Sequence, residues 1–198
     1  MKSDRIFKDQ LFSRVSEIYP QNTLDLAVID FDGLTQLYNS ASTELVTTHG
    51  VKEEREWSAY GCGFASFVES WFYYDKPEFE FEGMDGKGYN GVCILFCLLE
   101  PMFAAGETHK TWGEHGGGGM LPSLGMIDEY SSKPVEMLSA RICRHLKASG
   151  IPQVSKRTLE EPIRSDIAIE SNMKESNLKL FDAFYQCCLL YTSPSPRD

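Results

Sequence analysis

The sequence predicts one folded domain that combines helices and strands, of the α/β or α+β class. Apolar residues at helical spacing alternate along the chain with short apolar runs that are typical of buried strands, and no segment repeats. The length of 198 residues suits a single domain with a core of ordinary size. An apolar content of 42% and an aromatic content of 12% argue against disorder.

The first part of the chain is predicted to form a helix, a strand and a second helix. A lead-in helix is expected within residues 1–24, where Ile6, Phe7, Leu11, Val15 and Ile18 share helical spacing and Pro20 ends the pattern. Residues 24–31, LDLAVIDF, form a short apolar run rich in strand formers and predict a buried strand. Residues 35–49 favour a helix, and the acidic residues 52–57 favour a solvated helix face or a loop.

The middle of the chain is predicted to contain an edge strand, a second buried strand and a long loop. The aromatic residues 64–75 fit a helix or a strand equally well. Residues 76–91 first alternate apolar and acidic side chains, as an edge strand does, and then turn on glycines. Residues 92–99, VCILFCLL, predict the second buried strand, whereas glycine is so dense in residues 106–125 that we expect mostly loop.

The clearest predicted helix covers residues 132–150. Pro134 lies in its first turn, Gly150 supplies its C-terminal cap, and Val135, Leu138, Ile142 and Leu146 line one face. A short strand at 151–155 and a further helix at 177–186 complete the predicted single domain of residues 25–186. Residues 187–198 resemble a translated sequencing-adapter tail, and their Ser/Pro composition does not pack a core.

Charge and cysteine usage narrow the classes of partner and compartment. A net charge of −10 argues against nucleic acid or an anionic membrane as partner, because both require basic patches. The longest apolar run is broken at Glu100 and Pro101 and is too short to span a bilayer. The 6 cysteines form no C-x-x-C pair, and Cys93 and Cys97 lie in an apolar run. We therefore expect reduced, buried thiols and a cytoplasmic protein.

The leading candidate site is Asp30-Phe31-Asp32-Gly33, at the end of the first predicted strand. A carboxylate at the C-terminal end of a buried strand is a frequent metal ligand, and a glycine beside it lets a phosphate approach closely. A strand that ends in an Asx-type turn explains the same residues, because Asp and Gly serve such turns equally well. Both interpretations stay open on spacing alone.

Three families resemble this stretch. Haloacid-dehalogenase-like phosphatases carry D-x-D-G-T, but Leu34 stands here in the threonine position. Diguanylate cyclases carry a motif that DGLTQLYN partly matches, although their G-G-[DE]-E-F signature is missing. Class III nucleotidyl cyclases carry D-h-x-G-h-T-x-L, where h is apolar, and DFDGLTQL fits this pattern without a gap.

Two further segments resemble the class III cyclases, in the family's order. KGYNGVCILF, residues 87–96, is similar to the strand that carries the second metal ligand, with Asn90 in the aspartate position. Residues 134–155 resemble the later helix and strand, with Arg141 in the arginine position and Ser155 at the end. The resemblance covers residues 25–158.

The resemblance implies an α+β fold with a ferredoxin-like βαββαβ core, an added α/β element and a mainly antiparallel sheet. It also implies conversion of ATP or GTP to the cyclic monophosphate with Mg²⁺ or Mn²⁺, in a homodimer or a heterodimer with a cyclase-like chain. The implied site residues are Arg141 and Asn90 for catalysis, Asp30 and Asp32 at the metal, and Phe31, Gly33, Leu34 and Thr35 at the nucleotide.

Departures from the pattern predict a weakly active or inactive cyclase. A two-metal site needs two carboxylates, and Asn90 is neutral. Asp85 lies near but out of register, and Met137 stands where the family has an asparagine. Two alternatives remain: a phosphatase with Asp30 as nucleophile, and a non-catalytic interaction module that pairs with a competent cyclase-like chain.

The segment 107–119 offers a second polar cluster. Glu107, His109, Glu114 and His115 are side chains that bind zinc or iron, but their spacing matches no known metal motif, so solvated loop residues are expected. The HGGGG run in this segment is similar to the oxyanion loop of lipase-type hydrolases, which also need a G-x-S-x-G motif that this chain lacks.

Overall fold

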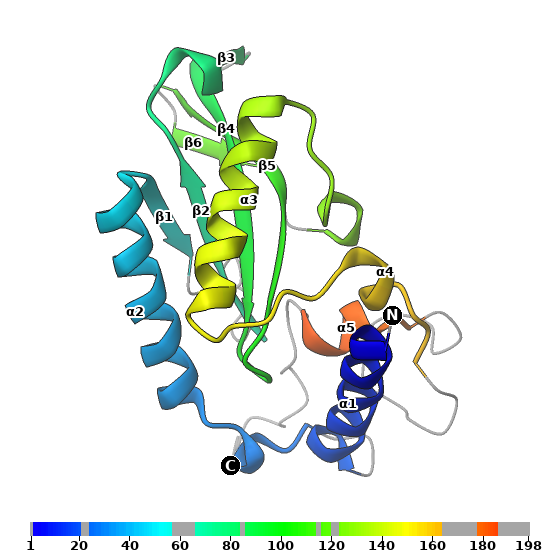
Figure 1. Cartoon of the computed structure of the whole chain (residues 1–198). Coiled ribbons are helices and arrows are strands. Elements are labelled where there is room, and N and C mark those ends of the chain that lie inside the picture. Colours follow the sequence, from blue (N-terminus) through cyan, green and yellow to red (C-terminus); the bar gives the residue numbers. More distant parts are fainter. Residues whose placement is uncertain are drawn as a thin grey trace, which may run out of the picture.

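The computed structural model places one antiparallel sheet behind two helices, α2 and α3 (Figure 1). The structure describes residues 2–20, 24–56, 66–83, 86–113, 116–119, 123–163 and 178–185. The helices are α1 (Lys2–Ile18), η2 (Leu26–Val28), α2 (Phe31–His49), η3 (Pro77–Phe79), η4 (Leu124–Met126), α3 (Lys133–Ala148), α4 (Lys156–Leu159) and α5 (Leu180–Phe184). The strands are β1 (Lys52–Glu56), β2 (Phe67–Tyr73), β3 (Glu80–Gly83), β4 (Gly86–Cys97), β5 (Phe103–Gly113) and β6 (Gly116–Gly119).

The strands follow one another across the sheet in the order β1-β2-β4-β5-β6, and β3 pairs with the first part of β4. Every pair among these strands is antiparallel. The second half of β4, Val92 to Cys97, is fully buried, and β2 and β5 flank it on its two sides. These pairings confirm the predicted α+β class with a mainly antiparallel sheet.

The element order differs from the βαββαβ core that the cyclase resemblance implies. In the described part of the chain, α1 and α2 precede all six strands, and α3 follows them. The predicted strand at 24–31 was wrong, because these residues form η2 and the start of α2, and Leu26 and Val28 are exposed. Aspartates explain the difference: Asp25 and Asp30 each accept a hydrogen bond from a backbone N–H and so cap helical turns.

Helices α2 and α3 confirm the helices predicted at 35–49 and 132–150. The Tyr38 ring of α2 stacks on Phe96 of β4 at 4.6 Å, and its hydroxyl donates to the Cys97 carbonyl at 2.5 Å. Ser132 caps α3 by accepting from Val135 N–H, and Gly150 has φ of +85° just beyond the end of the helix. Together the two helices cover one face of the sheet (Figure 1).

Helix α1 confirms the predicted lead-in helix and belongs to the core of the domain. Leu11, Val15 and Ile18 are buried, and Tyr19 donates to the Ala183 carbonyl of α5 at 2.9 Å. The Ser66 hydroxyl and the Cys97 thiol both donate to the Phe184 carbonyl. These contacts join α1 and α5 to the end of the sheet where β4 finishes, and α5 confirms a helix within the predicted 177–186.

Two segments form strands that were not predicted. The first was predicted to be a solvated helix face or a loop, and the second to be mostly loop. The acidic residues 52–57 include β1, and the glycine-rich residues 106–125 include most of β5 and all of β6. Backbone pairing with β2 and β4 fixes β1 and the part of β5 beyond Ala105, although neither carries an apolar run. Gly106 has a further reason to be glycine, because a Cβ there would lie 2.1 Å from the Met126 carbonyl oxygen. The 151–155 strand reduces to one bridge between Phe103 and Gln153.

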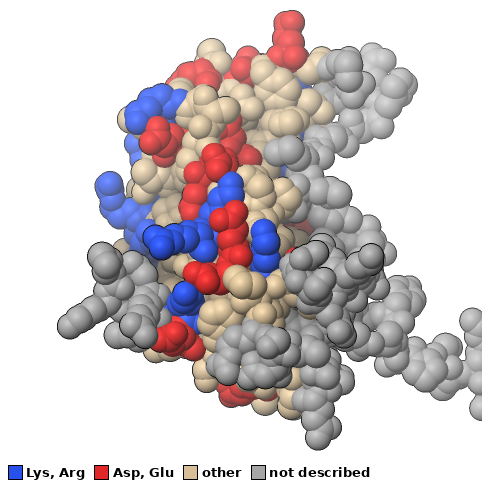
Figure 2. Space-filling view, turned by 90° about the vertical axis from the view of Figure 1, so that its right-hand side faces the viewer, with Lys and Arg blue, Asp and Glu red and all other residues tan. Residues whose placement is uncertain are grey.

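Charge is distributed unevenly over the surface. The chain has 29 acidic and 19 basic residues, and Figure 2 shows Lys and Arg side chains from the left-hand edge to the middle of this face, with Asp and Glu side chains among them. Helix α2 contains no Lys or Arg, whereas α3 carries Lys133, Arg141, Arg144 and Lys147.

Candidate functional site

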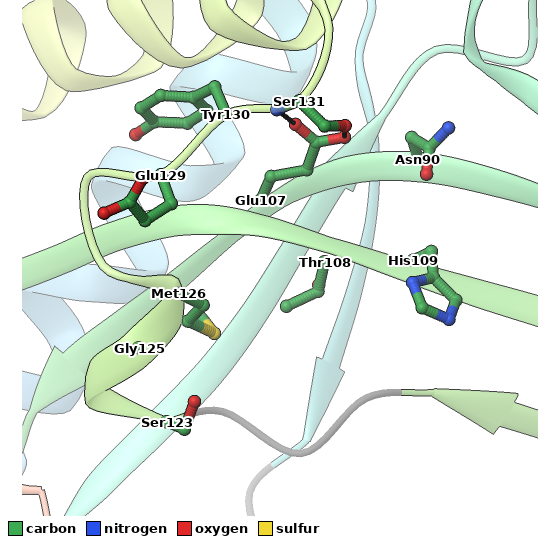
Figure 3. A pocket seen from close by; sticks show the side chains of 10 residues that line it. All are labelled: Asn90, Glu107, Thr108, His109, Ser123, Gly125, Met126, Glu129, Tyr130 and Ser131. Carbon is green, nitrogen blue, oxygen red and sulfur yellow. Dashed lines mark hydrogen bonds between the residues drawn. The ribbon is translucent and has the colours of Figure 1, made fainter.

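A hollow of about 500 Å³ lies where β5 faces the segment that leads into α3 (Figure 3). Residues Asn90, Glu107, Thr108 and His109 of β4 and β5 form one part of its wall, and residues of the segment 123–131 form the other. We call this hollow the β5-edge pocket. The segment is held to β5 by two backbone hydrogen bonds, from Glu107 N–H to the Glu129 carbonyl and from Asp128 N–H to the Ala105 carbonyl.

Glu107 is the most firmly held polar group of the pocket. Its carboxylate accepts the Ser131 N–H at 2.5 Å and the Ser131 hydroxyl at 2.7 Å (Figure 3). In the described part of the chain, no Lys, Arg or His forms an ion pair with this carboxylate. The side chain is therefore oriented by neutral donors, and no basic side chain of the described residues compensates its negative charge.

The neighbouring polar side chains project from paired strand positions. Asn90 and His109 are directly opposed in the β4–β5 register, so they share one face of the sheet. The exposed His109 ring contacts the Phe81 ring edge-on at 5.4 Å. Glu129 pairs with Lys156 at 2.6 Å, which neutralises its charge. The polar part of the pocket thus holds one uncompensated carboxylate, an amide and an imidazole.

Tyr130 closes the pocket toward α3. Its hydroxyl accepts a hydrogen bond from the Ser139 hydroxyl at 2.6 Å. Burial raises the pKa of Tyr130 well above its ordinary value, so the phenol stays neutral at physiological pH. Met126 is buried beside it and adds apolar surface. This side of the pocket therefore presents an aromatic ring and a thioether.

The predicted metal and nucleotide residues lie at the start of α2. Asp30 is the N-cap of α2, and its Oδ1 accepts the Gly33 N–H at 2.9 Å. Phe31, Asp32 and Gly33 form the first helical turn, Leu34 is buried in the core and Thr35 follows on the helix. Asp30 therefore caps a helix, whereas the alternative that the sequence left open was a strand ending in an Asx-type turn. Among the described residues, no group of three His, Cys, Asp or Glu side chains is placed to hold a metal ion.

Asp30 and Asn90 lie at opposite ends of the sheet. Helix α2 begins at the bottom of Figure 1 and β4 begins at the top. Tyr38, more than two helical turns beyond Asp30, contacts Cys97 at the far end of β4. At about 3.3 Å per residue, Asn90 lies about 20 Å back along the strand from Cys97. The structure therefore does not bring the two predicted metal-ligand positions together.

Arg141 lies in a different hollow, on the outer side of α3. This hollow of about 370 Å³, which we call the α3 hollow, is lined by Tyr74, Lys76, Glu78, Phe79, Lys133, Pro134, Met137, Leu138 and Arg141. The Arg141 guanidinium donates to the Tyr74 hydroxyl at 2.8 Å. Met137, in the position where the cyclases have an asparagine, is 60% exposed. Asn90 lines the β5-edge pocket, and Asp30 lines neither hollow.

The second polar cluster is placed only in part. Glu107 and His109 both line the β5-edge pocket, on β5 instead of the predicted loop, while Glu114, His115 and Asp85 lie outside the described residues. The sequence contained a signal for the placed pair: Glu107 and His109 have the alternating spacing that puts side chains on one face of a strand. The many glycines around them led to the prediction of a loop instead.

The described cysteines are free thiols in the core. Cys93, Cys97 and Cys143 are buried and unpaired by disulfides. Burial raises the pKa of all three thiols, to about 12 for Cys97, so they stay protonated and unreactive at neutral pH. The expectation of reduced, buried thiols is confirmed for these three, while Cys62, Cys187 and Cys188 lie outside the described residues.

No family model, curated protein or solved structure matches this chain. None of the helices in the described part of the chain combines the length and the apolar character needed to cross a membrane.

Proposed function

We propose that this chain is a non-catalytic interaction module that binds an acidic protein segment through the outer face of α3. Lys133, Arg141, Arg144 and Lys147 are all exposed on this helix, and Glu136 is its only acidic residue. We call this surface the α3 basic face. It stands out because the whole chain has a net charge of −10. A local excess of one sign on a protein of the other sign attracts partners of complementary charge.

The charges of this face are largely unused within the protein. Lys133 pairs with Glu136 at 2.8 Å, and Arg141 donates to the neutral Tyr74 hydroxyl. For Arg141, Arg144 and Lys147, no ion pair occurs among the described residues. These guanidinium and ammonium groups therefore contribute little to the stability of the folded state, and they are available to pair with carboxylates of a partner.

An apolar centre accompanies the charges. Met137 is 60% exposed and borders the α3 hollow, together with Tyr74, Phe79, Pro134 and Leu138. Protein interfaces are enriched in Arg, Met and aromatic side chains, and an apolar anchor commonly fills a pocket within a polar rim. The preferred partner is therefore an acidic segment that also carries an apolar side chain.

Cyclase activity stays a prediction of the sequence resemblance. Its metal site requires Asp30 close to Asn90, and these residues lie at opposite ends of the sheet. The phosphatase alternative expects a parallel sheet with Asp30 at its edge, whereas all described strand pairs are antiparallel and Asp30 caps a helix. The separation of these residues is the reason for preferring binding over catalysis.

A labelled peptide tests the proposal. An amphipathic peptide of Glu and Leu is titrated against the protein by fluorescence anisotropy, beside a peptide with Lys in place of Glu. We expect binding of the acidic peptide alone, weakened by salt and by Arg144→Glu. The matched control is Arg157→Glu, which makes the same charge change at an exposed position of α4. Equal binding of both peptides, or equal loss in both variants, would contradict the assignment.

A further inference from the structure

We propose that the β5-edge pocket binds a small organic molecule that carries one cationic amine on an apolar or aromatic body. This inference is independent of the α3 basic face, because the two surfaces share no lining residue and lie on different elements. The volume of about 500 Å³ is typical of small-molecule sites.

The charge of the pocket calls for a single cation. Among the described residues, Glu107 and Glu129 are the acidic ones that line it, and Lys156 neutralises Glu129 at 2.6 Å. The remaining charge is that of Glu107, whose oxygens each accept one bond from Ser131 and keep a further lone pair. The Glu107 carboxylate is already oriented, so it loses little further entropy when an ammonium group donates to it. Hydrogen bonds between charged groups are also stronger than those between neutral groups.

The remaining walls define the rest of the ligand. Figure 3 shows Asn90 and His109 on one side of Glu107, and Met126 and Tyr130 on the other. The Asn90 amide oxygen can accept a second N–H of an ammonium, which has three donors. The Tyr130 ring and the Met126 thioether offer contact to an apolar or aromatic body, and a ring face also attracts a nearby cation.

Other ligand classes fit the described residues less well. An anion would meet the uncompensated Glu107 carboxylate, and the described residues include no Lys or Arg that lines this pocket. A metal ion would need at least three suitable ligands, and no such group occurs among the described residues. The chemistry that remains is a monovalent organic cation.

Three probes of similar shape separate charge from shape. Phenethylamine, phenethyl alcohol and hydrocinnamate are titrated into uniformly ¹⁵N-labelled protein, and amide shifts are followed by NMR. We expect phenethylamine to shift the amides of residues 107–109 and 123–131 with an affinity at least about tenfold above that of the alcohol, since one hydrogen bond to a charged group is at stake. Equal affinity for the three probes, or shifts confined to other residues, would overturn the proposal.

Variants change the charge of the pocket in both directions. Glu107→Gln should weaken phenethylamine binding at least about tenfold, and Asn90→Asp, which adds a carboxylate, should strengthen it. The matched control for Asn90→Asp is Gln36→Glu, which makes the same charge change at an exposed position of α2. If Glu107→Gln fails to fold, Asn90→Asp still decides: a folded Asn90→Asp protein that binds the amine no better than the Gln36→Glu control overturns the proposal.

Discussion

Asp30 and Gly33 depend on each other at the start of α2. The Asp30 carboxylate folds over the first turn to accept the Gly33 N–H, so a Cβ at Gly33 would lie 2.2 Å from Asp30 Oδ2. An N-cap carboxylate satisfies a backbone donor that the helix itself leaves free and interacts favourably with the helix dipole. The motif that suggests a metal ligand is thus accounted for by helix initiation.

Substitutions at Asp30 separate capping from metal binding. We expect Asp30→Ala to lower the free energy of unfolding by about 1 kcal/mol, because a cap is lost. Asp30→Ser should keep most of the stability, since serine caps helices equally well. Urea denaturation with and without Mg²⁺ measures both. A Mg²⁺-dependent stabilisation of the wild type that both variants abolish would instead support the metal site.

At the scale of single residues, the sequence narrowed the Asp30 motif to two interpretations and could not choose between them. Asp and Gly serve a metal site, a turn and a helix cap through the same atoms. The predicted strand before Asp30 depended on Leu26 and Val28, whose residue types are typical of buried strands but which are exposed in the structure. Asp25 prevents the strand by accepting the Ala27 N–H at 2.9 Å. The competition between a strand and an aspartate-capped helical turn depends on single side chains, so it produces no hydrophobic periodicity in the sequence.

The junction of β5 with the segment before α3 depends on Gly106. A Cβ there would lie 2.1 Å from the Met126 carbonyl oxygen, and backbone cannot move aside as a flexible side chain can. We expect Gly106→Ala to lower the free energy of unfolding by about 2 kcal/mol and to abolish ligand binding in the β5-edge pocket. For the stability measurement, Gly125→Ala is the matched control, because the nearest neighbour of a Cβ there would be the Ser123 hydroxyl at 3.5 Å. Equal stability of the two variants by urea denaturation would show that the backbone around position 106 accommodates the added Cβ.

A pair of histidines at the contact of α2 with α3 predicts sensitivity to acid. His49 ends α2, and its ring lies edge-on to that of His145 at 5.6 Å. Partial burial, then His145 and Arg141, lower the pKa of His49. The folded state thus disfavours the protonated ring, so this contribution to stability is present above the ordinary histidine pKa of about 6.5 and is lost as the pH falls below it.

We therefore expect the free energy of unfolding to fall between about pH 7 and pH 5.5, in part because of His49. His49→Gln should flatten this dependence. Urea titrations at several pH values measure the slope for both proteins. An unchanged slope in His49→Gln would assign the acid sensitivity to other groups.

At the scale of elements, helices were predicted better than strands. Helices α1 and α3 carry apolar residues at helical spacing, and α3 also has its Pro and Gly at the expected ends. Strand β4 was found because its buried half is an unbroken apolar run. Strands β1, β5 and β6 are rich in charge or glycine, and their pairing comes from neighbours distant in sequence.

For the whole molecule, the class of fold followed from the sequence, but the order of its elements did not. A mostly antiparallel sheet with helices is compatible with many connections, and one misassigned strand at 24–31 was enough to suggest a βαββαβ order. The same error placed Asp30 beside Asn90. The α3 basic face could be predicted from the spacing of Lys133, Arg141, Arg144 and Lys147. The net charge of the whole chain is negative, however, and gives no sign of a basic surface.

The cyclase prediction can be tested on the whole molecule by restoring the two residues in which the chain departs from that family. Asn90→Asp together with Met137→Asn supplies the missing carboxylate and amide. We expect no formation of cyclic AMP or cyclic GMP with Mn²⁺, because Asp30 remains at the start of α2 while position 90 lies about 20 Å along β4 from the end that α2 contacts. Two metal ions that share a triphosphate need carboxylates within a few ångströms of each other.

The assay uses ATP and GTP in turn, with product detection by mass spectrometry and thermal unfolding as the check on folding. The wild type and each single variant serve as controls, since a trace activity in the preparation would appear in all of them. A gain of cyclase activity confined to the double variant would mean that Asp30 and position 90 meet in one site. That result would restore the cyclase assignment and would require the start of α2 to adopt a different conformation in the active protein.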